Sequence, residues 1–582
     1  MATFSIGTSQ FLLDGEPFRL LSGAMHYFRV PPAYWGDRMH KARLLGLNTL
    51  ETYVAWNRHE PRPGEFDFAG ILDLSAYLAL AAEHGLWTLV RPGPYICSEW
   101  DLGGLPAWLL ADPGMKLRCA HPTYLEAVDR FLDALVPVLV PHQVTRGGRL
   151  LAVQVENEYG SYGNDETYLR HLADGLRRRG IDVPLFTSDG PSDEMLQYGT
   201  LPDIHKVANF GSGADGAFAK LREYQPDGPL MCGEYWLGWF DHWGEAHHQR
   251  PAADAAAALD GILAAGGSVN LYMYHGGTNF GFYNGANFHQ GQYQPTITSY
   301  DDDAPLDEAG DPTPKYFAIR EVIGRYAALP ADPVPAPAPK MALGTVCLEQ
   351  SVPLLASLSQ LSTPVLRATP EPMENLGQSF GFIYYRTRVS GPRAAAPLLV
   401  RHLRDRALVW LDGQLLGTLE RERPESGLSF AVPTGGATLE LLVENMGRIN
   451  YGPELLDRKG ITEGVVLGQQ YLYGWTLRSL PLDDLSGLEW SAGPPSAYPA
   501  FCRGQFTVPD EPHDTFLALP GWTKGVAWVN GFNLGRYWQR GPQRTLYVPA
   551  PLLRPGANEL VLLELHGAEA PSVAFTDRPD LG

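Results

Sequence analysis

Two glutamates close short apolar runs in this chain, and aromatic residues stand next to them. Glu158 ends the run LLAVQVENE, and Glu234 ends the run LMCGE, which Tyr235 and Trp236 follow. A carboxylate at the end of a strand is held at a rigid rim, where a second carboxylate and aromatic rings can surround a ligand. Two carboxyl groups that flank one bond, with aromatic faces for a sugar ring, can cleave a glycosidic bond. A surface position is the alternative for either glutamate alone, but the pair favours catalysis.

The segments around these glutamates alternate between strand-like and helix-like patterns. The eight apolar runs are residues 18–27, 49–56, 87–96, 150–158, 183–188, 206–210, 230–234 and 268–274. Amphipathic stretches separate them, and eight such alternations over about 300 residues are typical of a (β/α)8 TIM barrel, whose active site lies at the carboxyl ends of the strands. An open doubly wound sheet alternates similarly, but no glycine-rich nucleotide-binding motif follows the first run. We therefore predict that Glu158 and Glu234 share one barrel mouth.

The alternation ends at a proline- and alanine-rich stretch, LPADPVPAPAPK, which is typical of a semi-rigid linker. Short alternating runs with turn residues follow, and they indicate all-β modules. The predicted protein is therefore multidomain, α/β plus all-β. Its predicted parts are a catalytic barrel over residues 1–328, a linker over 329–345, and two jelly-roll-like β-sandwich domains over 346–480 and 481–582.

An internal repeat supports two related β-domains. The segment ALVWLDGQLLG at residues 407–417 aligns with GVAWVNGFNLG at residues 525–535. Each copy carries a two-residue hairpin signal, Asp412-Gly413 in the first and Asn530-Gly531 in the second. An exchange of strands between the two domains stays open, as does their role: they could bind carbohydrate or only support the barrel.

Charge and composition exclude several classes of partner. The chain has 582 residues and a formal net charge of −20, which would repel nucleic acids and anionic membrane surfaces. No run of about 18 apolar residues suggests a membrane span. We therefore expect a small carbohydrate ligand, with no nucleic-acid or membrane partner. The oligomeric state stays open, with a homodimer among the options.

Cysteine and histidine positions predict neither a disulfide framework nor a metal site. The five cysteines are widely spaced and include no C-x-x-C pair, so reduced thiols are expected. His26, His59 and His275 lie near the ends of three different runs, where hydrogen-bonding roles are more common than a shared zinc ion. We expect no metal and no cofactor. The N-terminal residues lack the pattern of a signal peptide, which favours a cytoplasmic location.

Several long motifs, in the same order, resemble family 35 of the glycoside hydrolases, the β-galactosidases, and especially its compact bacterial members. The motifs are RPGPYICSEWDLGGLPAWLL, QVENEYGSYG, GEYWLGWFDHWG, SVNLYMYHGGTNFGF, TSYDDDAPLDEAGDPTPKY and NMGRINYGPELLDRKGI. The resemblance implies a retaining exo-β-galactosidase, which releases terminal non-reducing β-D-galactose from oligosaccharides through a covalent galactosyl-enzyme. It also implies a preference for β-1,3 linkages.

The resemblance assigns roles to particular residues. Glu158 corresponds to the acid/base and Glu234 to the nucleophile. The galactose-binding positions carry over to Tyr53, Cys97, Ser98, Glu99, Asn157, Tyr272 and Tyr300. We expect Trp236 and Trp239, which lie next to the nucleophile in the sequence, to form a stacking floor for the following sugar. The sequence departs from the family at Asp302, where a tyrosine is common.

The two glutamates need different protonation states. A negative Glu234 would raise the pKa of a nearby Glu158 and keep it protonated, as a general acid requires. Two alternatives remain: a retaining glycosidase for another β-linked sugar, and a non-catalytic carbohydrate-binding protein. The second is disfavoured because both glutamates are present.

Overall fold

The computed structural model describes residues 2–423 and 427–582. Its N-terminal part is a closed barrel of parallel strands in the order β10-β11-β4-β5-β6-β7-β8-β9, closed by pairing between β9 and β10. The barrel strands are β4 (Leu21–Met25), β5 (Thr49–Tyr53), β6 (Trp87–Arg91), β7 (Leu150–Gln154), β8 (Leu185–Asp189), β9 (His205–Phe210), β10 (Met231–Trp236) and β11 (Ser268–His275). Each of the eight predicted runs overlaps one of these strands, so the predicted barrel is confirmed.

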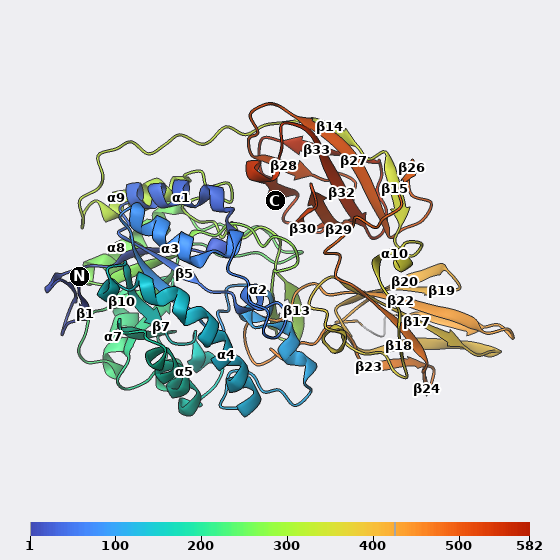
Figure 1. Ribbon diagram of the computed structural model, residues 1–582, viewed down its shortest axis with the longest axis horizontal. Helices are drawn as coiled ribbons and strands as arrows, with labels where there is room; N and C mark the ends of the chain where they lie inside the picture. Colours follow the sequence, from blue (N-terminus) through green and yellow to red (C-terminus); the bar gives the residue numbers. More distant parts are fainter. Residues whose placement is uncertain (1, 424–426) are drawn as a thin grey trace.

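Helices surround the barrel on its outer side (Figure 1). The main ones are α1 (Pro32–Leu45), α3 (Leu74–Glu83), α4 (Pro122–Leu139), α5 (Glu166–Arg178), α6 (Asp193–Tyr198), α7 (Ala214–Tyr224), α8 (Ala252–Ala264) and α9 (Pro314–Ile323). Local chemistry sets their starts: the side chains of Asp73 and Asp165 accept backbone N–H groups at the beginnings of α3 and α5. Because helices cover the outside and side chains fill the inside, most strand residues are buried.

The proline-rich stretch leaves the barrel as an extended segment. Residues 329–339 form neither helix nor strand, and they cross the outside of the molecule towards the C-terminal module (Figure 1). Proline lacks an N–H group and restricts the backbone, so such a stretch favours neither a helix nor a central strand.

The first all-β module consists of two packed antiparallel sheets. Their strand orders are β16-β25-β17-β22-β19-β20 and β21-β18-β23-β24. The strands are β16 (Val365–Arg367), β17 (Phe382–Val389), β18 (Arg393–Arg404), β19 (Arg406–Leu411), β20 (Gln414–Glu420), β21 (Ser429–Val432), β22 (Ala437–Glu444), β23 (Gly460–Leu467), β24 (Gln470–Tyr471) and β25 (Trp475–Leu480). Ile383 and Leu441 from one sheet share a core with Val400 and Val465 from the other, as in a β-sandwich.

The second all-β module has the same two-sheet plan, with strand orders β14-β33-β28-β31 and β26-β15-β27-β32-β29-β30. The strands are β14 (Gly344–Cys347), β15 (Gln350–Pro353), β26 (Ser491–Ala492), β27 (Ala500–Val508), β28 (Thr515–Ala518), β29 (Lys524–Val529), β30 (Phe532–Trp538), β31 (Thr545–Val548), β32 (Gly556–Glu564) and β33 (Ser572–Thr576). Residues 346–353, assigned from the sequence to the first domain, thus pair instead with C-terminal strands β33 and β27. The chain enters the second module before it builds the first.

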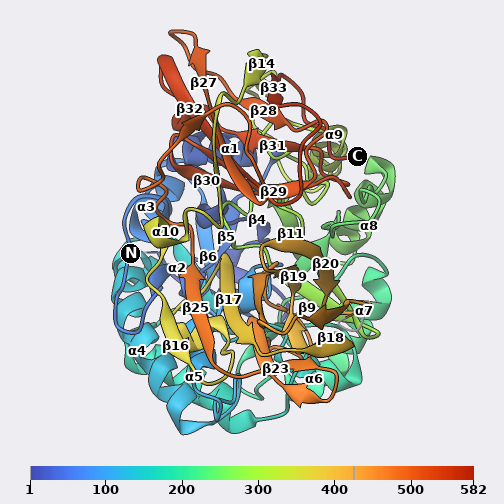
Figure 2. The ribbon, with the colours of Figure 1, turned by 90° about the vertical axis from the view of Figure 1, so that its right-hand side faces the viewer.

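The internal repeat forms two equivalent hairpins, β19–β20 and β29–β30. Asp412 and Gly413 have φ of 48° and 77°, and Asn530 and Gly531 have φ of 50° and 82°. Positive φ at both turn positions is the geometry that these residue pairs favour. The repeat's tryptophans, Trp410 and Trp528, are each 3% exposed and belong to one apolar cluster that joins the two modules. Figure 2 shows the modules one above the other in front of the barrel.

The cysteines form no disulfide among the described residues. All five cysteines are unpaired, and Cys97, Cys232 and Cys502 are buried. Within residues 2–423 and 427–582, no helix combines the length and the apolar character that crossing a bilayer requires.

Candidate active site

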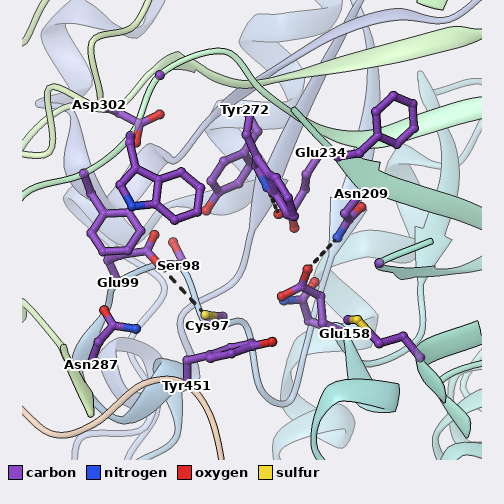
Figure 3. Close-up of a pocket in the computed structure, with 18 of the residues that line it drawn as sticks. Cys97, Ser98, Glu99, Glu158, Asn209, Glu234, Tyr272, Asn287, Asp302 and Tyr451 are labelled. Carbon is purple, nitrogen blue, oxygen red and sulfur yellow. Dashed lines mark hydrogen bonds between the residues drawn. The ribbon is translucent and has the colours of Figure 1, made fainter. Parts of the chain in front are cut away.

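A pocket of about 520 Å³ opens at the carboxyl ends of the barrel strands, and both glutamates line it (Figure 3). Its wall combines residues from several strands: Tyr53 ends β5, Asn209 and Phe210 end β9, and Tyr272 lies in β11. A pocket of this size at this edge of a barrel is where a small ligand is expected to bind.

Glu234 lies in β10, is 5% exposed, and has both carboxylate oxygens hydrogen-bonded. Its Oε1 accepts from Tyr53 OH at 2.7 Å and from Arg91 Nη2 at 2.6 Å, and its Oε2 accepts from Trp236 Nε1 at 3.1 Å. The Arg91 guanidinium lies 4.1 Å from the centre of the Tyr53 ring, which packs both donors together. These contacts hold the carboxylate in one orientation at the pocket wall, as a nucleophile requires.

Glu158 follows β7 on a left-handed backbone, with φ of 48° and ψ of 42°. Its N–H donates to the carbonyl of Ser188 at 3.0 Å, which fixes the turn, and its Oε1 accepts from Asn209 Nδ2 at 3.0 Å. Burial and the negative charge of Glu234 raise the pKa of Glu158 to about 8. Glu158 is therefore protonated at neutral pH, while its partly exposed side chain faces the pocket.

Asn157, just before Glu158, has its side-chain oxygen fully engaged. The Oδ1 atom accepts from Gln154 Nε2 at 3.1 Å and from Arg91, and it lies 3.0 Å from the Tyr53 hydroxyl, whose single proton goes to Glu234 at the shorter distance. Because these donors determine which way the amide points, its Nδ2 group is left to donate to a ligand in the pocket that Asn157 lines.

The loop that carries Glu99 has an unusual backbone. Cys97, Ser98 and Glu99 are consecutive non-glycine residues with φ of 55°, 60° and 50°. Such conformations are costly, so the surroundings must stabilise them. Arg29 donates from Nη1 to Ser98 Oγ at 2.7 Å and from Nη2 to the Ser98 carbonyl. Tyr300 OH donates to Glu99 Oε2 from behind the loop.

The structure brings nearly all of the predicted site residues to this pocket. Tyr53, Cys97, Ser98, Glu99, Asn157, Trp236, Trp239 and Tyr272 line it together with Glu158 and Glu234. Tyr300 is the exception: it is 1% exposed and lies behind Glu99, outside the lining. Its phenol orients Glu99 and lies 3.4 Å from the hydroxyl of Tyr272.

The two tryptophans differ in their surroundings. Trp239 is 43% exposed at the rim, whereas Trp236 donates its indole N–H to Glu234. Their rings meet edge to face with centroids 5.9 Å apart. Trp239 also stacks on Phe240, with ring centroids 5.0 Å apart, so only its other face could receive a ligand. Trp236 is part of the support of Glu234.

Sequence reasoning missed several members of the site. Arg91 and Asn209 contact the glutamates directly, and only their places at the ends of β6 and β9 could have indicated this. Tyr451 also lines the pocket, although it belongs to the first β-module and is 37% exposed. Its motif, NMGRINYGPELLDRKGI, is quoted above, but nothing local shows that it reaches the barrel.

Tyr451 reaches the pocket because residues 445–459, the connection from β22 to β23, lie against the barrel mouth; this connection is called the mouth segment below. Arg448 is fully buried and pairs with Asp101 of the barrel at 3.2 Å and with Glu374 at 2.5 Å. Tyr95 OH donates to the carbonyl of Asn450. The mouth segment therefore holds the barrel loop that ends at Asp101.

The three histidines near the strand ends lie in separate surroundings. His26 contacts Arg29, His59 contacts Tyr27, and His275 lies apart at the end of β11. Among the residues described, no group of three or more histidine, cysteine, aspartate or glutamate side chains is arranged to hold a metal ion.

Comparison with known proteins agrees with the motifs. The family model described as glycosyl hydrolases family 35 matches residues 10–326, and models for the first all-beta domain and the galactose-binding domain of beta-galactosidase match residues 370–482 and 499–558. A Mus musculus protein named beta-galactosidase-1-like protein is 46% identical over 595 residues, which cover 98% of this chain and 91% of that protein. Beta-galactosidases of Bos taurus and Xanthomonas manihotis are 45% and 46% identical, over 98% and 94% of this chain and 92% and 91% of theirs. These matches confirm the resemblance seen in the motifs, and the chain belongs to family 35 of the glycosyl hydrolases.

Proposed function

We propose that this protein is a retaining exo-β-galactosidase that releases terminal non-reducing β-D-galactose. Relatives named beta-galactosidase match it over nearly the whole chain, which supports the choice of sugar. One observation carries the chemistry: Glu158 and Glu234 share a pocket but have opposite environments. Glu234 accepts three donors, one of them cationic, while Glu158 is held protonated by burial and by the charge of Glu234.

The proposed first step joins attack and protonation. An oxygen of Glu234 forms a bond to the anomeric carbon while the glycosidic bond breaks, and Glu158 gives its proton to the departing oxygen. Once Glu234 is esterified, its charge is gone and the pKa of Glu158 falls. Glu158, now an anion, takes a proton from water, which attacks the anomeric carbon and releases Glu234. Two inversions give net retention.

We place the terminal sugar inside the pocket, next to Glu158 and Glu234. Asn157 Nδ2 is free to bind the sugar's 2-hydroxyl, a contact that strengthens in the transition state. Glu99, with a pKa raised by burial, and Tyr272 face the same space. Trp239 and Tyr451 stand at the rim, where the next sugar would leave the pocket, and a flat aromatic face selects among linkage geometries. We propose that β-1,3-linked galactosides are the preferred substrates.

Two variants test the catalytic pair. Glu234→Gln should abolish hydrolysis of aryl β-galactosides, because only a small residual rate survives loss of a nucleophile. Glu158→Ala should slow disaccharides far more than activated aryl galactosides, and azide should restore turnover with a β-galactosyl azide product. Activity of Glu234→Gln within tenfold of wild type, or equal losses without rescue in Glu158→Ala, would reject these roles.

The sugar and the linkage need separate assays. A panel of chromogenic β-glycosides compares galactose with glucose and mannose, and a higher kcat/KM for another sugar would replace galactose in the proposal. Galactosyl disaccharides with β-1,3, β-1,4 and β-1,6 linkages, assayed side by side, test the linkage preference.

We also propose that the protein works in a reducing compartment such as the cytoplasm. The support is chemical: its five cysteines are unpaired, and a reducing environment keeps thiols in this state. Fractionation of cells that express the natural gene, followed by activity assays, tests the location.

A further inference from the structure

The run of three aspartates in the motif TSYDDDAPLDEAGDPTPKY puts one carboxyl group into the pocket. The outer two have partners outside the pocket: Asp301 Oδ1 accepts from Glu308 N at 2.9 Å, and Asp303 Oδ2 accepts from Lys315 Nζ at 2.6 Å. Asp302 lines the pocket and is 6% exposed. The run therefore has two structural carboxyl groups and one that faces the ligand space.

Only one of the two Asp302 carboxyl oxygens forms a hydrogen bond within the protein. Its Oδ2 accepts from Met273 N at 3.0 Å, but no group among residues 2–423 and 427–582 forms a hydrogen bond with Oδ1. A polar atom that faces a pocket and has no partner in the protein can form a hydrogen bond with a ligand there. The atom without a partner is thus a place where a ligand can gain binding free energy.

The surroundings keep this carboxyl neutral. Burial raises the pKa of Asp302 well above its usual range, and the charge of Glu99 adds to the effect, while the N–H of Met273 and the ammonium of Lys315 act in the opposite direction. A neutral carboxylic acid can accept with one oxygen and donate with the other. Oδ2 accepts from Met273, so the proton belongs on Oδ1, which can donate to a hydroxyl.

Figure 3 shows Asp302 on the same side of the pocket as Glu99, with Glu158 on the opposite side. The scissile bond must lie beside Glu158 and Glu234, so a terminal sugar extends from there towards Asp302 and Glu99. Asp302 therefore faces the part of the sugar that is remote from the anomeric carbon, where the 3-, 4- and 6-hydroxyls are.

We propose that Asp302 is a sugar-binding residue, whose carboxyl group forms a hydrogen bond from Oδ1 to the 3-, 4- or 6-hydroxyl of the terminal sugar. The inference rests on the proposed galactosidase function and deepens it.

The test combines variants with substrates that lack one hydroxyl. Wild type, Asp302→Asn and Asp302→Ala are assayed on an aryl β-galactoside and on its 3-, 4- and 6-deoxy analogues. The amide of Asn keeps an acceptor for Met273 and a donor for the sugar, so Asp302→Asn should stay within about threefold of wild type. Asp302→Ala should lose about ten- to a hundredfold in kcat/KM on the parent galactoside. On one deoxy analogue it should lose nothing further, because the contact is already absent.

Other outcomes would overturn the proposal. Equal losses of Asp302→Ala on all four substrates would mean that Asp302 acts only through Met273. A loss in Asp302→Asn as large as in Asp302→Ala would mean that the carboxyl works as an anion. Asp302→Gly is a second deletion variant, because the φ of 59° at this position suits glycine and favours folding.

Two controls distinguish a failure of the Asp302 proposal from a failure of the proposed galactosidase function. Asp301→Asn changes a neighbouring carboxyl outside the pocket, and it should affect all four substrates by the same factor. Wild-type activity on the parent galactoside tests the proposed function by itself. If wild type prefers another β-glycoside, the proposed function fails, and the deoxy series of that sugar then tests Asp302 independently.

Discussion

The two β-modules share a sheet plan and a hairpin motif, yet they support different parts of the barrel mouth. In both, an aspartate or asparagine followed by glycine turns the hairpin, and a tryptophan enters the common core. The first module sends its mouth segment against the loop that carries Glu99. The second contacts the segment before Asp302. Similar local sequences thus produce the same scaffold, while the connections between strands decide what each module does.

The first module contributes charge and a pocket residue. Arg448 N and Nη1 both donate to the carboxylate of Asp101, which lies two residues after Glu99. Asn450 Nδ2 lies 3.5 Å from Cys97 Sγ, and Tyr451 lines the pocket. Since residues 97–99 have an unfavourable backbone, these contacts stabilise the loop that carries Glu99 from outside the barrel.

At the segment before Asp302, the second module contacts the barrel through neutral hydrogen bonds. Thr298 Oγ1 donates to the Arg536 carbonyl at 2.7 Å, and Ser299 N donates to Gln543 Oε1 at 2.9 Å. Gly535 packs so closely that an added Cβ would lie 2.4 Å from Thr298 Cγ2. Within the part of the chain that the structure describes, this module adds no side chain to the lining of the pocket. Its effect on catalysis should be indirect and smaller.

The largest expected effect comes from breaking the first module's contact. Arg448→Ala leaves Asp101 and Glu374 buried without their cation, which should lower the free energy of unfolding by about 3–5 kcal/mol. Because the Glu99 loop loses its support, kcat/KM of the folded fraction should fall by about a hundredfold or more. Thermal unfolding and kinetics on an aryl galactoside measure the two effects.

Arg406→Ala is the control for Arg448. Arg406 is also buried in the first module and pairs with Glu420 at 3.4 Å, but neither residue belongs to the mouth segment or to the Glu99 loop. It should destabilise the protein while the folded enzyme keeps its kcat/KM. Equal losses of kcat/KM in both variants would mean that the effect comes from destabilisation of the whole protein and not from lost support of this loop.

Removing the second module's contact should have a smaller effect. Gln543→Ala leaves the Ser299 N–H without its partner, at a cost of about 1–3 kcal/mol in stability. We expect kcat/KM to fall by about tenfold at most, since Tyr300 can still reach Glu99. A loss of kcat/KM as large as that of Arg448→Ala would show that both modules support catalysis to the same extent, which contradicts the difference described above.

Variants of the aromatic residues at the rim should affect disaccharides more than aryl galactosides. Tyr451→Ala and Trp239→Ala should each lower kcat/KM for a β-1,3-linked disaccharide by about ten- to a hundredfold, taking the burial of an aromatic side chain as the scale. An aryl galactoside with a good leaving group should be much less affected. Trp236→Ala should slow both substrates, because its indole N–H supports Glu234. Equal losses of Tyr451→Ala on both substrates would place this tyrosine outside the second sugar's site.

The smallest expected effect concerns pH. Glu158 must be protonated in the free enzyme, and its pKa is raised to about 8, so kcat/KM should be constant below this pH and fall as pH rises through it. Figure 3 shows the Tyr451 ring on the Glu158 side of the pocket. Its removal admits water and weakens the burial that raises this pKa, so the falling limb should move to lower pH by about one unit or less. The limb should not move in Gln543→Ala; a shift there, or none in Tyr451→Ala, contradicts the assignment.

By itself, the sequence determined the elements and much of the site. Apolar runs placed the eight barrel strands, Asp-Gly and Asn-Gly placed the hairpins, and strand ends placed Glu158 and Glu234 at one mouth. These signals are local, because a strand's burial pattern and a turn's φ angles depend on a few neighbouring residues.

Only the tertiary structure decided the contacts between residues far apart in the chain. In it, β15 pairs with β27, and Tyr451 of the first module lines the barrel pocket. Tyr300 donates a hydrogen bond to Glu99, and Trp236 donates one to Glu234. No local pattern predicts such contacts, since they depend on how whole modules pack and which buried charges they must pair. Arg448 and Asp101 are 347 positions apart, and the need to pair them out of water is what ties the module to the barrel.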